Sequence, residues 1–191
     1  MGASLTLSIL IPSAQEPRIL EMLMETEHLF PAAQIIISND RERRGKGWAI
    51  REAMSECDGD LVCLIDGDLD ISPLEIRNLL QYIDDFDIVV GRKNLSGSFK
   101  RKIITVCCRI FTGVTFGLWL DTQTGVKLFR REFINEWKND SFIYDIEVLY
   151  RANKMGARIK QVPVKVNIRK EMPVRSIIKF LLDAVKLRVS L

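Results

Sequence analysis

Short apolar runs alternate with segments of helical periodicity along the first half of the chain. The apolar runs are rich in β-branched residues and lack polar alternation, which is typical of strands covered on both faces of a mostly parallel sheet. The segments between them repeat apolar residues every three or four positions, as amphipathic helices do. We therefore predict an α/β fold with strands at 5–12, 34–38 and 60–66 and helices at 19–29 and 48–57.

Helix-start signals follow the third apolar run. Ser72 can cap a helix, Pro73 can take its first position and Glu75 can complete a capping box, so a helix is predicted directly behind Asp66. The remaining pattern predicts a strand at 87–90, a helix at 145–155 and a strand-like stretch at 158–168. Together these elements indicate one α/β domain of mostly parallel strands flanked by helices.

Residues 103–120 form a long apolar segment whose only charge is Arg109. The segment is borderline in length for a membrane span, and Arg109 weakens that interpretation. Two alternatives remain: a helix lying in a membrane interface, or a buried core helix with an arginine at its edge.

The C-terminal segment, 173–191, is basic and amphipathic. Arg175, Lys179 and Lys186 fall on one helical face, which is typical of helices that lie on membrane surfaces. We assign residues 1–168 to a catalytic domain that includes an interface helix at about 101–119, and residues 169–191 to a basic amphipathic helix.

Composition narrows the chemistry. The four cysteines have no CxxC spacing, so we expect a reduced, cytoplasmic compartment. The single histidine, His28, makes histidine-based dyads and zinc sites improbable, so catalysis would run on carboxylates, Lys, Arg and a metal. Residues 151–191 hold eleven Lys and Arg against two acids, a net charge of +9, which indicates an anionic partner there. We expect that partner to be a membrane surface and not a nucleic acid.

Three alternating aspartates, Asp66, Asp68 and Asp70, follow the buried strand at 60–66. Ligands of open α/β sheets bind beyond the carboxyl ends of strands, where this acidic loop is predicted to lie. Converging carboxylates need a cation, and a hard ion such as Mg²⁺ or Mn²⁺ completed by donor phosphates is the simplest one. Gly67 is expected to allow the sharp turn. A solvated acidic turn is the plainer alternative.

A second motif, Gly45-Lys46-Gly47, opens a predicted helix, where backbone amides and the lysine can meet a phosphate. It is not a dinucleotide-binding fingerprint, because Ile50 replaces the third glycine. The chain contains no GxxxxGK[ST] sequence, which excludes a P-loop nucleotidase.

Stretches that span nearly the whole chain resemble the family 2 glycosyltransferases of GT-A fold, and most closely the branch of dolichyl-phosphate mannose synthase and the polyprenyl-phosphate glycosyltransferases. The resemblance rests on LSILIPSAQE, QIIISND, GKGWAIREAM, DGDLVCLIDGDLDISPLEI, IVVGRK, DTQTGVKLFRR and YDIEVLYRANKMGARIKQVPVKV, in that order. The resemblance implies a GT-A, Rossmann-like sheet and transfer of a sugar from a nucleotide-sugar.

The resemblance also implies roles for individual residues. Metal binding falls to Asp66, Asp68 and Asp70, and catalysis to Asp68, Arg92 and Lys127. The nucleotide-sugar site comprises Pro12, Ser13, Glu16, Asp40, Lys46, Asp66 and Asp68. The acceptor or donor phosphates would meet Arg92, Arg169 and Arg175.

Four features depart from the family pattern. The segment between Asp40 and Gly45 is short, and Asn39 replaces the first acid of an Asp-Asp pair. The stretch PSAQE lacks the usual aromatic or Asn after the first strand. Met172 and Val174 replace a Gly and a Ser near the C-terminus. The base-recognition side of the pocket is therefore reduced.

The expected acceptor is a polyprenyl or dolichyl phosphate, because its anionic oxygen needs no general base. We expect inverting transfer of a hexose, with GDP-mannose favoured as donor and UDP-glucose next, by an enzyme peripheral to the cytoplasmic face of a membrane. The alternatives are transfer to a hydroxyl with Asp145 or Glu147 as base, a phosphatase using Asp66 and Asp68, and a nucleotide-sugar-binding module without turnover.

Overall fold

The computed structural model describes residues 5–14, 16–40, 42, 44–93, 99–134, 137–167 and 174–191, with the side chains of 99–102 and 174–176 left out. Six strands form one sheet in the order β2-β1-β3-β5-β4-β6. Their bounds are β1 Leu7–Ser13, β2 Gln34–Asn39, β3 Leu61–Ile65, β4 Ile88–Lys93, β5 Val126–Arg130 and β6 Ile159–Val164. Only β5 runs antiparallel to its neighbours, so the predicted mostly parallel sheet is confirmed.

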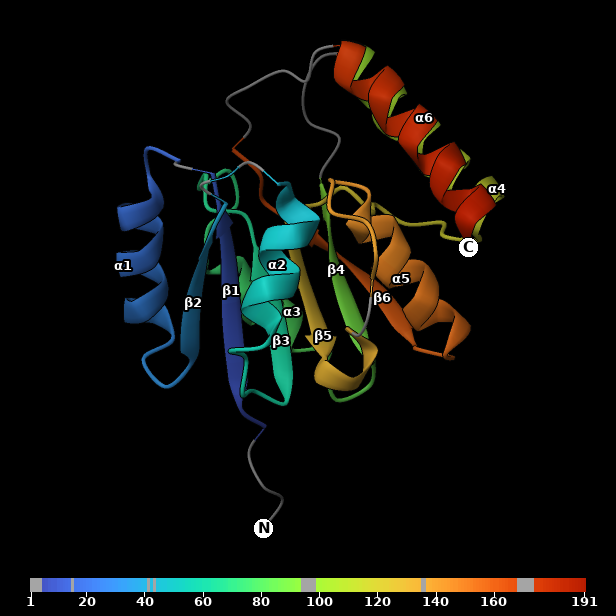
Figure 1. Ribbon diagram of the computed structural model, residues 1–191. Helices are drawn as coiled ribbons and strands as arrows, with labels where there is room; N and C mark the ends of the chain where they lie inside the picture. The colour runs from blue at the N-terminus through green and yellow to red at the C-terminus, as the bar shows by residue number, and fades with distance from the viewer. Residues whose placement is uncertain are drawn as a thin grey trace.

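Helices cover both faces of the sheet, as Figure 1 shows with α2 and α5 in front and α3 behind. Residues of α1 and α3 share one core cluster with the sheet, and residues of α2 and α5 share the other. The helices are α1 Ile19–Leu29, α2 Lys46–Met54, α3 Glu75–Leu80, α4 Phe99–Phe116, α5 Tyr144–Lys154 and α6 Val174–Ser190, with a 3-10 turn at Arg131–Phe133. The predicted helices and strands are therefore present, with ends displaced by a few residues.

Strand β5 is the element that the apolar pattern does not predict. Lys127 interrupts its apolar run, yet Val126 to Phe129 are all buried between β3 and β4. Lys127 can occupy this position because Asp145 of α5 lies 2.8 Å from its ammonium nitrogen. Charge pairing, which no local periodicity reveals, accounts for the missed strand.

The predicted capping box is not formed. The hydroxyl of Ser72 accepts from the backbone N–H of Leu74 and donates to Glu25, whereas the carboxylate of Glu75 accepts from Asn78. The helix begins at Glu75, so Ser72 fixes the turn before the helix and contacts α1 instead of closing a reciprocal cap.

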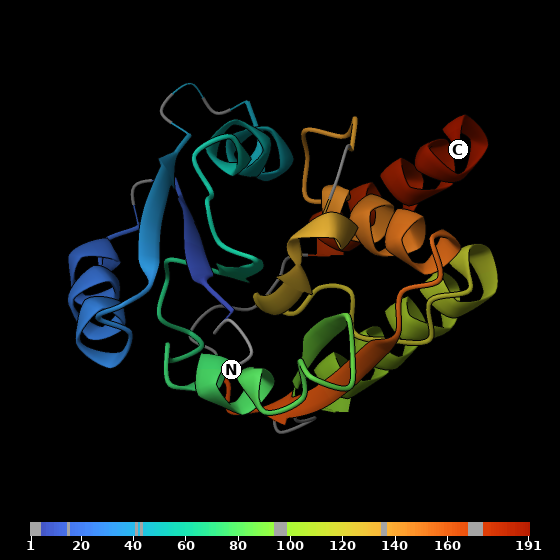
Figure 2. The same ribbon diagram turned by 90° about the horizontal axis from the view of Figure 1, so that it is seen from below.

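Helices α4 and α6 lie on the β6 side of the molecule, away from α1 (Figures 1 and 2). Helix α6 packs on the core through Phe180, Ala184 and Leu187. Arg109 of α4 is half-buried and donates to Asp121 at 3.0 Å, so this arginine faces the domain. No described helix is long and apolar enough to cross a membrane.

Both helices expose a stripe of apolar side chains with helical spacing. On α4 the stripe consists of Ile103, Val106, Ile110 and Val114, and on α6 of Ile178, Leu182, Val185 and Val189. Each side chain is about half exposed or more, an unusual arrangement for a surface that meets only water.

Candidate active site

The residues predicted for the nucleotide-sugar site come from the carboxyl ends of β1, β2 and β3 and from the start of α2, at one edge of the sheet (Figure 1). Ser13 and Asn39 end two paired parallel strands, and Asp66 follows β3. The N–H of Asp40 donates to the carbonyl of Ser13 at 3.0 Å, which ties two of these strand ends together. This is the edge at which open α/β sheets bind ligands.

Lys46 and Asp66, which come from two separate motifs, form an ion pair at this edge. Burial lowers the pKa of Lys46, but the carboxylates of Asp66 and Asp145 more than offset it, so the pKa lies above its ordinary value. Lys46 is therefore a charged ammonium at the start of α2, beside the acidic loop. A cation at this position suits a ligand that carries phosphates.

The acidic loop is tightly built. Leu69 adopts a left-handed backbone conformation with φ of 58°, although its side chain is buried. This conformation is disfavoured for a branched residue and costs about 1–2 kcal/mol. Gly67 has no positive φ, so the prediction that it allows the turn is wrong; a Cβ there would lie 2.9 Å from Ile19 Cδ1, and close packing is what favours glycine.

The three aspartates of the loop do not form a ready-made metal cage. Among the described residues no group of three acidic, histidine or cysteine side chains could hold a metal ion, so the role of Asp70 as a third ligand stays a prediction. The backbone N–H of Asp70 donates to the carboxylate of Asp68 at 3.0 Å. Burial raises the pKa of Asp68, and the carboxylates of Asp66 and Asp70 add to the effect. Two carboxylates completed by donor phosphates fit a hard divalent ion.

Gly125 shapes the position of Asp66 from the neighbouring strand. The N–H of Asp66 donates to the carbonyl of Gly125 at 2.9 Å, and a Cβ at position 125 would lie 2.4 Å from Asp66 Oδ2. Sequence reasoning missed this residue. A Thr-Gly pair before an apolar run is a faint signal for such close packing, because the partner strand is known only from the fold.

The residues predicted for the nucleotide site support each other. Glu16 accepts from the hydroxyl of Ser13 at 2.6 Å and from the N–H of Ala14 at 2.7 Å. Asp40 accepts from the backbone N–H groups of Arg44 and Gly45, both at 2.8 Å. Asp40 therefore closes the short segment before α2, a role that the sequence motif alone does not indicate. Pro12 lies in β1 beside Ser38.

Lys127 is enclosed behind this edge and is not open to a substrate. Its side chain is 2% exposed, and its ammonium meets Asp145 at 2.8 Å and the carbonyl of Thr124 at 2.7 Å. In this arrangement the Lys127 ammonium faces Asp145, and the catalytic role expected of it stays a prediction. Burial also raises the pKa of the neighbouring Tyr144 well above its ordinary value, and Asp145 adds to that effect.

The carboxylate of Glu147, one of the two candidate bases, already accepts hydrogen bonds from other groups of the protein. Its carboxylate is 1% exposed and accepts from the backbone N–H groups of Lys138 and Asn139 and from Arg151. A general base needs an accessible lone pair within reach of the acceptor proton. The structure therefore contradicts the alternative in which Glu147 is the base.

The three arginines that are predicted to bind phosphate are described to different extents. Arg92 is exposed near the end of β4, two strands from Asp66, and has no ion-pair partner among the described residues. Arg169 lies outside the described residues. For Arg175 only the backbone, in the first turn of α6, is described. Of these three side chains the structure describes Arg92 alone, so the phosphate-binding roles stay predictions.

The profile of glycosyl transferase family 2 matches residues 13–137, more than half of the chain. This chain belongs to glycosyl transferase family 2. The matched range includes both the Gly45-Lys46-Gly47 turn and the acidic loop, so the motifs that meet at the sheet edge are those of the family. Family membership also argues against the phosphatase alternative.

Curated relatives of this family 2 chain include two from protists. The chain is 25% identical to a dolichyl-phosphate beta-glucosyltransferase of Trichomonas vaginalis, over 95% of this chain and 61% of the relative. It is 27% identical to a dolichyl-phosphate beta-glucosyltransferase of Dictyostelium discoideum, over 83% of this chain and 55% of the relative. The chain thus spans a little over half the length of these relatives.

Solved structures place the chain in the GT-A fold, as predicted. One is glucosyl-3-phosphoglycerate synthase from Mycobacterium tuberculosis, crystallised with Mn²⁺ and UDP-glucose. It superposes with a TM-score of 0.76 at 16% identity, over 95% of this chain and 77% of that protein. At this identity the likeness shows the fold alone.

Proposed function

We propose that this chain is a metal-dependent, inverting glycosyltransferase that moves a hexose from a nucleotide-sugar to a polyprenyl or dolichyl phosphate. The observation that carries the proposal is the meeting of Lys46 with Asp66 at the ligand-binding edge of a family 2 domain. The names of the curated relatives support the lipid-phosphate acceptor.

The donor we propose is UDP-glucose ahead of GDP-mannose, which reverses the order expected from the sequence. Both curated relatives described above are named as glucosyltransferases, which supports glucose as the transferred sugar. The short sequence between Asp40 and Gly45 supports the smaller pyrimidine base within this proposal.

A divalent ion, Mg²⁺ or Mn²⁺, held by Asp66 and Asp68 would neutralise charge on the departing diphosphate. Lys46 lies beside Asp66 and would exchange part of that contact for a phosphate oxygen. Arg92 is exposed near the end of β4 and would orient the acceptor phosphate. Ser13 and Glu16 would bound the nucleotide at the end of β1.

A phosphate acceptor agrees with the state of the candidate bases. Asp145 is buried against the ammonium of Lys127, and Glu147 is held by two backbone amides and Arg151. Neither carboxylate is presented as a free base for a hydroxyl. A polyprenyl phosphate needs only positioning, since its attacking oxygen is already anionic.

We further propose that the exposed apolar stripes of α4 and α6 rest on the cytoplasmic leaflet, where the lipid acceptor would be reached. Burial of half-exposed Val, Ile and Leu side chains in the acyl boundary is favourable, and the basic charge of residues 151–191 suits anionic headgroups. Flotation with vesicles containing anionic lipid tests this. Ile110→Asp and Leu182→Asp should prevent flotation, whereas Leu20→Asp, at an even more exposed apolar position on α1, should not.

The reaction is tested with a donor and acceptor panel. The protein is incubated with Mn²⁺ or Mg²⁺, labelled UDP-glucose or GDP-mannose, and a short polyprenyl phosphate or its free alcohol, and lipid-linked sugar is extracted. The proposal predicts product with the phosphate and none with the alcohol, and loss of product in Asp68→Asn. Absence of lipid-linked sugar with every donor would contradict the proposed function.

A further inference from the structure

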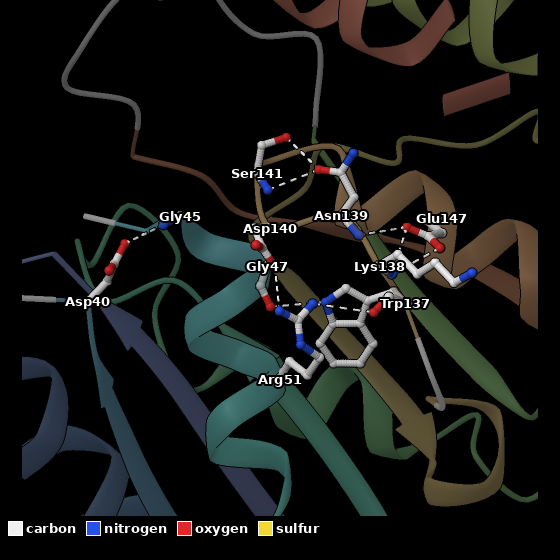
Figure 3. A network of polar contacts seen from close by, with 10 residues as sticks. All are labelled: Asp40, Gly45, Gly47, Arg51, Trp137, Lys138, Asn139, Asp140, Ser141 and Glu147. Atoms are coloured by element: carbon white, nitrogen blue, oxygen red, sulfur yellow. Dashed lines mark hydrogen bonds and ion pairs between the residues drawn. The ribbon is translucent and has the colours of Figure 1, made fainter. Parts of the chain in front are cut away.

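The segment 137–143 packs against the start of α2, and Figure 3 shows the polar contacts that hold it there. The N–H of Trp48 donates to the carbonyl of Asp140 at 3.2 Å, and the indole N–H of Trp137 donates to the carbonyl of Gly47 at 3.0 Å. Residues about ninety positions apart in sequence thus share main-chain hydrogen bonds around Lys46.

The two glycines of the Gly45-Lys46-Gly47 turn allow this close approach. A Cβ at Gly45 would lie 2.2 Å from the carbonyl oxygen of Asp140, and one at Gly47 would lie 2.3 Å from that of Asn139. Gly45 also has a φ of 123°, which side-chain-bearing residues rarely adopt. The turn that carries Lys46 therefore packs directly against the carbonyl groups of the 137–143 segment.

Arg51 holds the two pieces together from one turn further along α2. Its guanidinium forms an ion pair with Asp140 and donates to the carbonyl of Trp137 at 3.3 Å (Figure 3). Its side chain is about one-third exposed, so it can be changed without opening the core. Arg51 therefore links α2 to both Trp137 and Asp140 of the segment.

The segment is itself braced from α5. Glu147 accepts from the N–H groups of Lys138 and Asn139, and Asn139 in turn accepts from the N–H and hydroxyl of Ser141. Buried carboxylate bonds to backbone amides are strong, so they fix the carbonyl groups that face α2. Glu147 therefore holds the 137–143 segment in place, and the segment in turn contacts the start of α2.

We propose that residues 137–143 act as a backbone clamp that positions Lys46 for the donor diphosphate, with Arg51 and Trp137 as positioning residues for donor binding. This inference rests on the proposed function only in taking Lys46 as a phosphate ligand. The clamp fixes where α2 begins, and hence where the ammonium lies relative to Asp66. Glu147 thereby supports donor binding without touching substrate.

The test compares Arg51→Met and Trp137→Phe with a matched control, Arg158→Met. Arg158 also joins distant parts of the chain through an Arg–Asp pair, with Asp87, but it lies at the opposite end of the sheet. Amide hydrogen exchange over residues 44–49 is measured in the ligand-free protein, and the Kd values for UDP and GDP are measured with Mn²⁺. Thermal unfolding is recorded for each variant.

We expect Arg51→Met to weaken binding of the preferred nucleotide about three- to fivefold, since part-exposed pairs contribute modestly. Trp137→Phe should weaken it about fivefold, because it leaves the carbonyl of Gly47 without its buried donor. Both should speed exchange at 44–49, and Arg51→Lys should restore part of each effect. Arg158→Met should lower the unfolding temperature and change neither readout.

The inference is overturned if Arg51→Met and Trp137→Phe leave exchange at 44–49 unchanged, or if Arg158→Met weakens nucleotide binding equally. A wild-type protein that binds neither nucleotide would contradict the proposed function, whereas the exchange comparison still decides whether the clamp holds the turn. A protein that binds nucleotide normally in every variant contradicts the clamp alone.

Discussion

The buried pair of Lys127 and Asp145 leads to a quantitative prediction. Their side chains are 2% and 7% exposed, and the charged atoms lie 2.8 Å apart. With an effective dielectric constant of about 20, the Coulomb attraction at that distance is about 6 kcal/mol. Desolvation of the two groups offsets much of it, so the intact pair contributes little net stability. Removing one member is different, because the other charge stays buried.

Lys127→Met keeps the apolar stem and removes the charge, so it should lower the free energy of unfolding by about 3–5 kcal/mol. A domain of this size has about 5–15 kcal/mol in total, so the variant should still fold and the loss is measurable by urea titration. Adding Asp145→Asn should restore about 2 kcal/mol or more, because the stranded carboxylate disappears.

The double variant gives a second check on the same reasoning, because Lys127→Met leaves a buried carboxylate unpaired and the added Asp145→Asn removes it. A loss below about 1 kcal/mol, or a double variant as unstable as the single one, would refute the reasoning.

Three further predictions concern single positions. Gly125→Ala should abolish Mn²⁺-dependent nucleotide binding, measured by calorimetry, while unfolding changes little, because the added Cβ displaces the carboxylate of Asp66; retained binding would contradict the assigned ligand. Hydrogen bonds from Arg158 lower the pKa of Asp87, so Asp87 stabilises the fold above its unfolded pKa and loses that effect as the pH falls. Asp87→Asn should therefore cost about 1–2 kcal/mol at pH 7 and much less near pH 3, in urea titrations at both pH values; an equal cost at both would contradict this. Asp145→Asn should slow transfer to a lipid phosphate by less than about tenfold in the panel assay, because this carboxylate is paired with Lys127 and is not a base; abolished transfer in a folded variant would contradict this.

Most of the sheet follows from local patterns. The apolar runs around Ile9, Ile36 and Val62 predict buried parallel strands because they lack polar alternation. The same logic fails for β5, where Lys127 interrupts the run and is neutralised by a residue on a different element. A pattern read along one segment cannot supply that partner.

In the candidate site, too, features that depend on neighbours in sequence are predictable, and features that depend on tertiary contacts are not. The position of Asp66 at a strand end was predicted, as was the lysine at the start of α2, because both depend on neighbours in sequence. Their ion pair, the loop closure by Asp40 and the pairing of Arg109 with Asp121 depend on tertiary distances. The left-handed backbone of Leu69 is likewise imposed by packing around its buried side chain and not by its residue type.

The central claim is that the acceptor is a lipid phosphate and the donor a nucleotide-sugar bound at Lys46, Asp66 and Asp68. The most direct measurement is lipid-linked hexose formed from UDP-glucose and a short polyprenyl phosphate in the presence of Mn²⁺, by wild type and by Asp68→Asn in parallel. Product is expected from the wild type alone. Sugar transfer to a free hydroxyl with none to the lipid phosphate would contradict it.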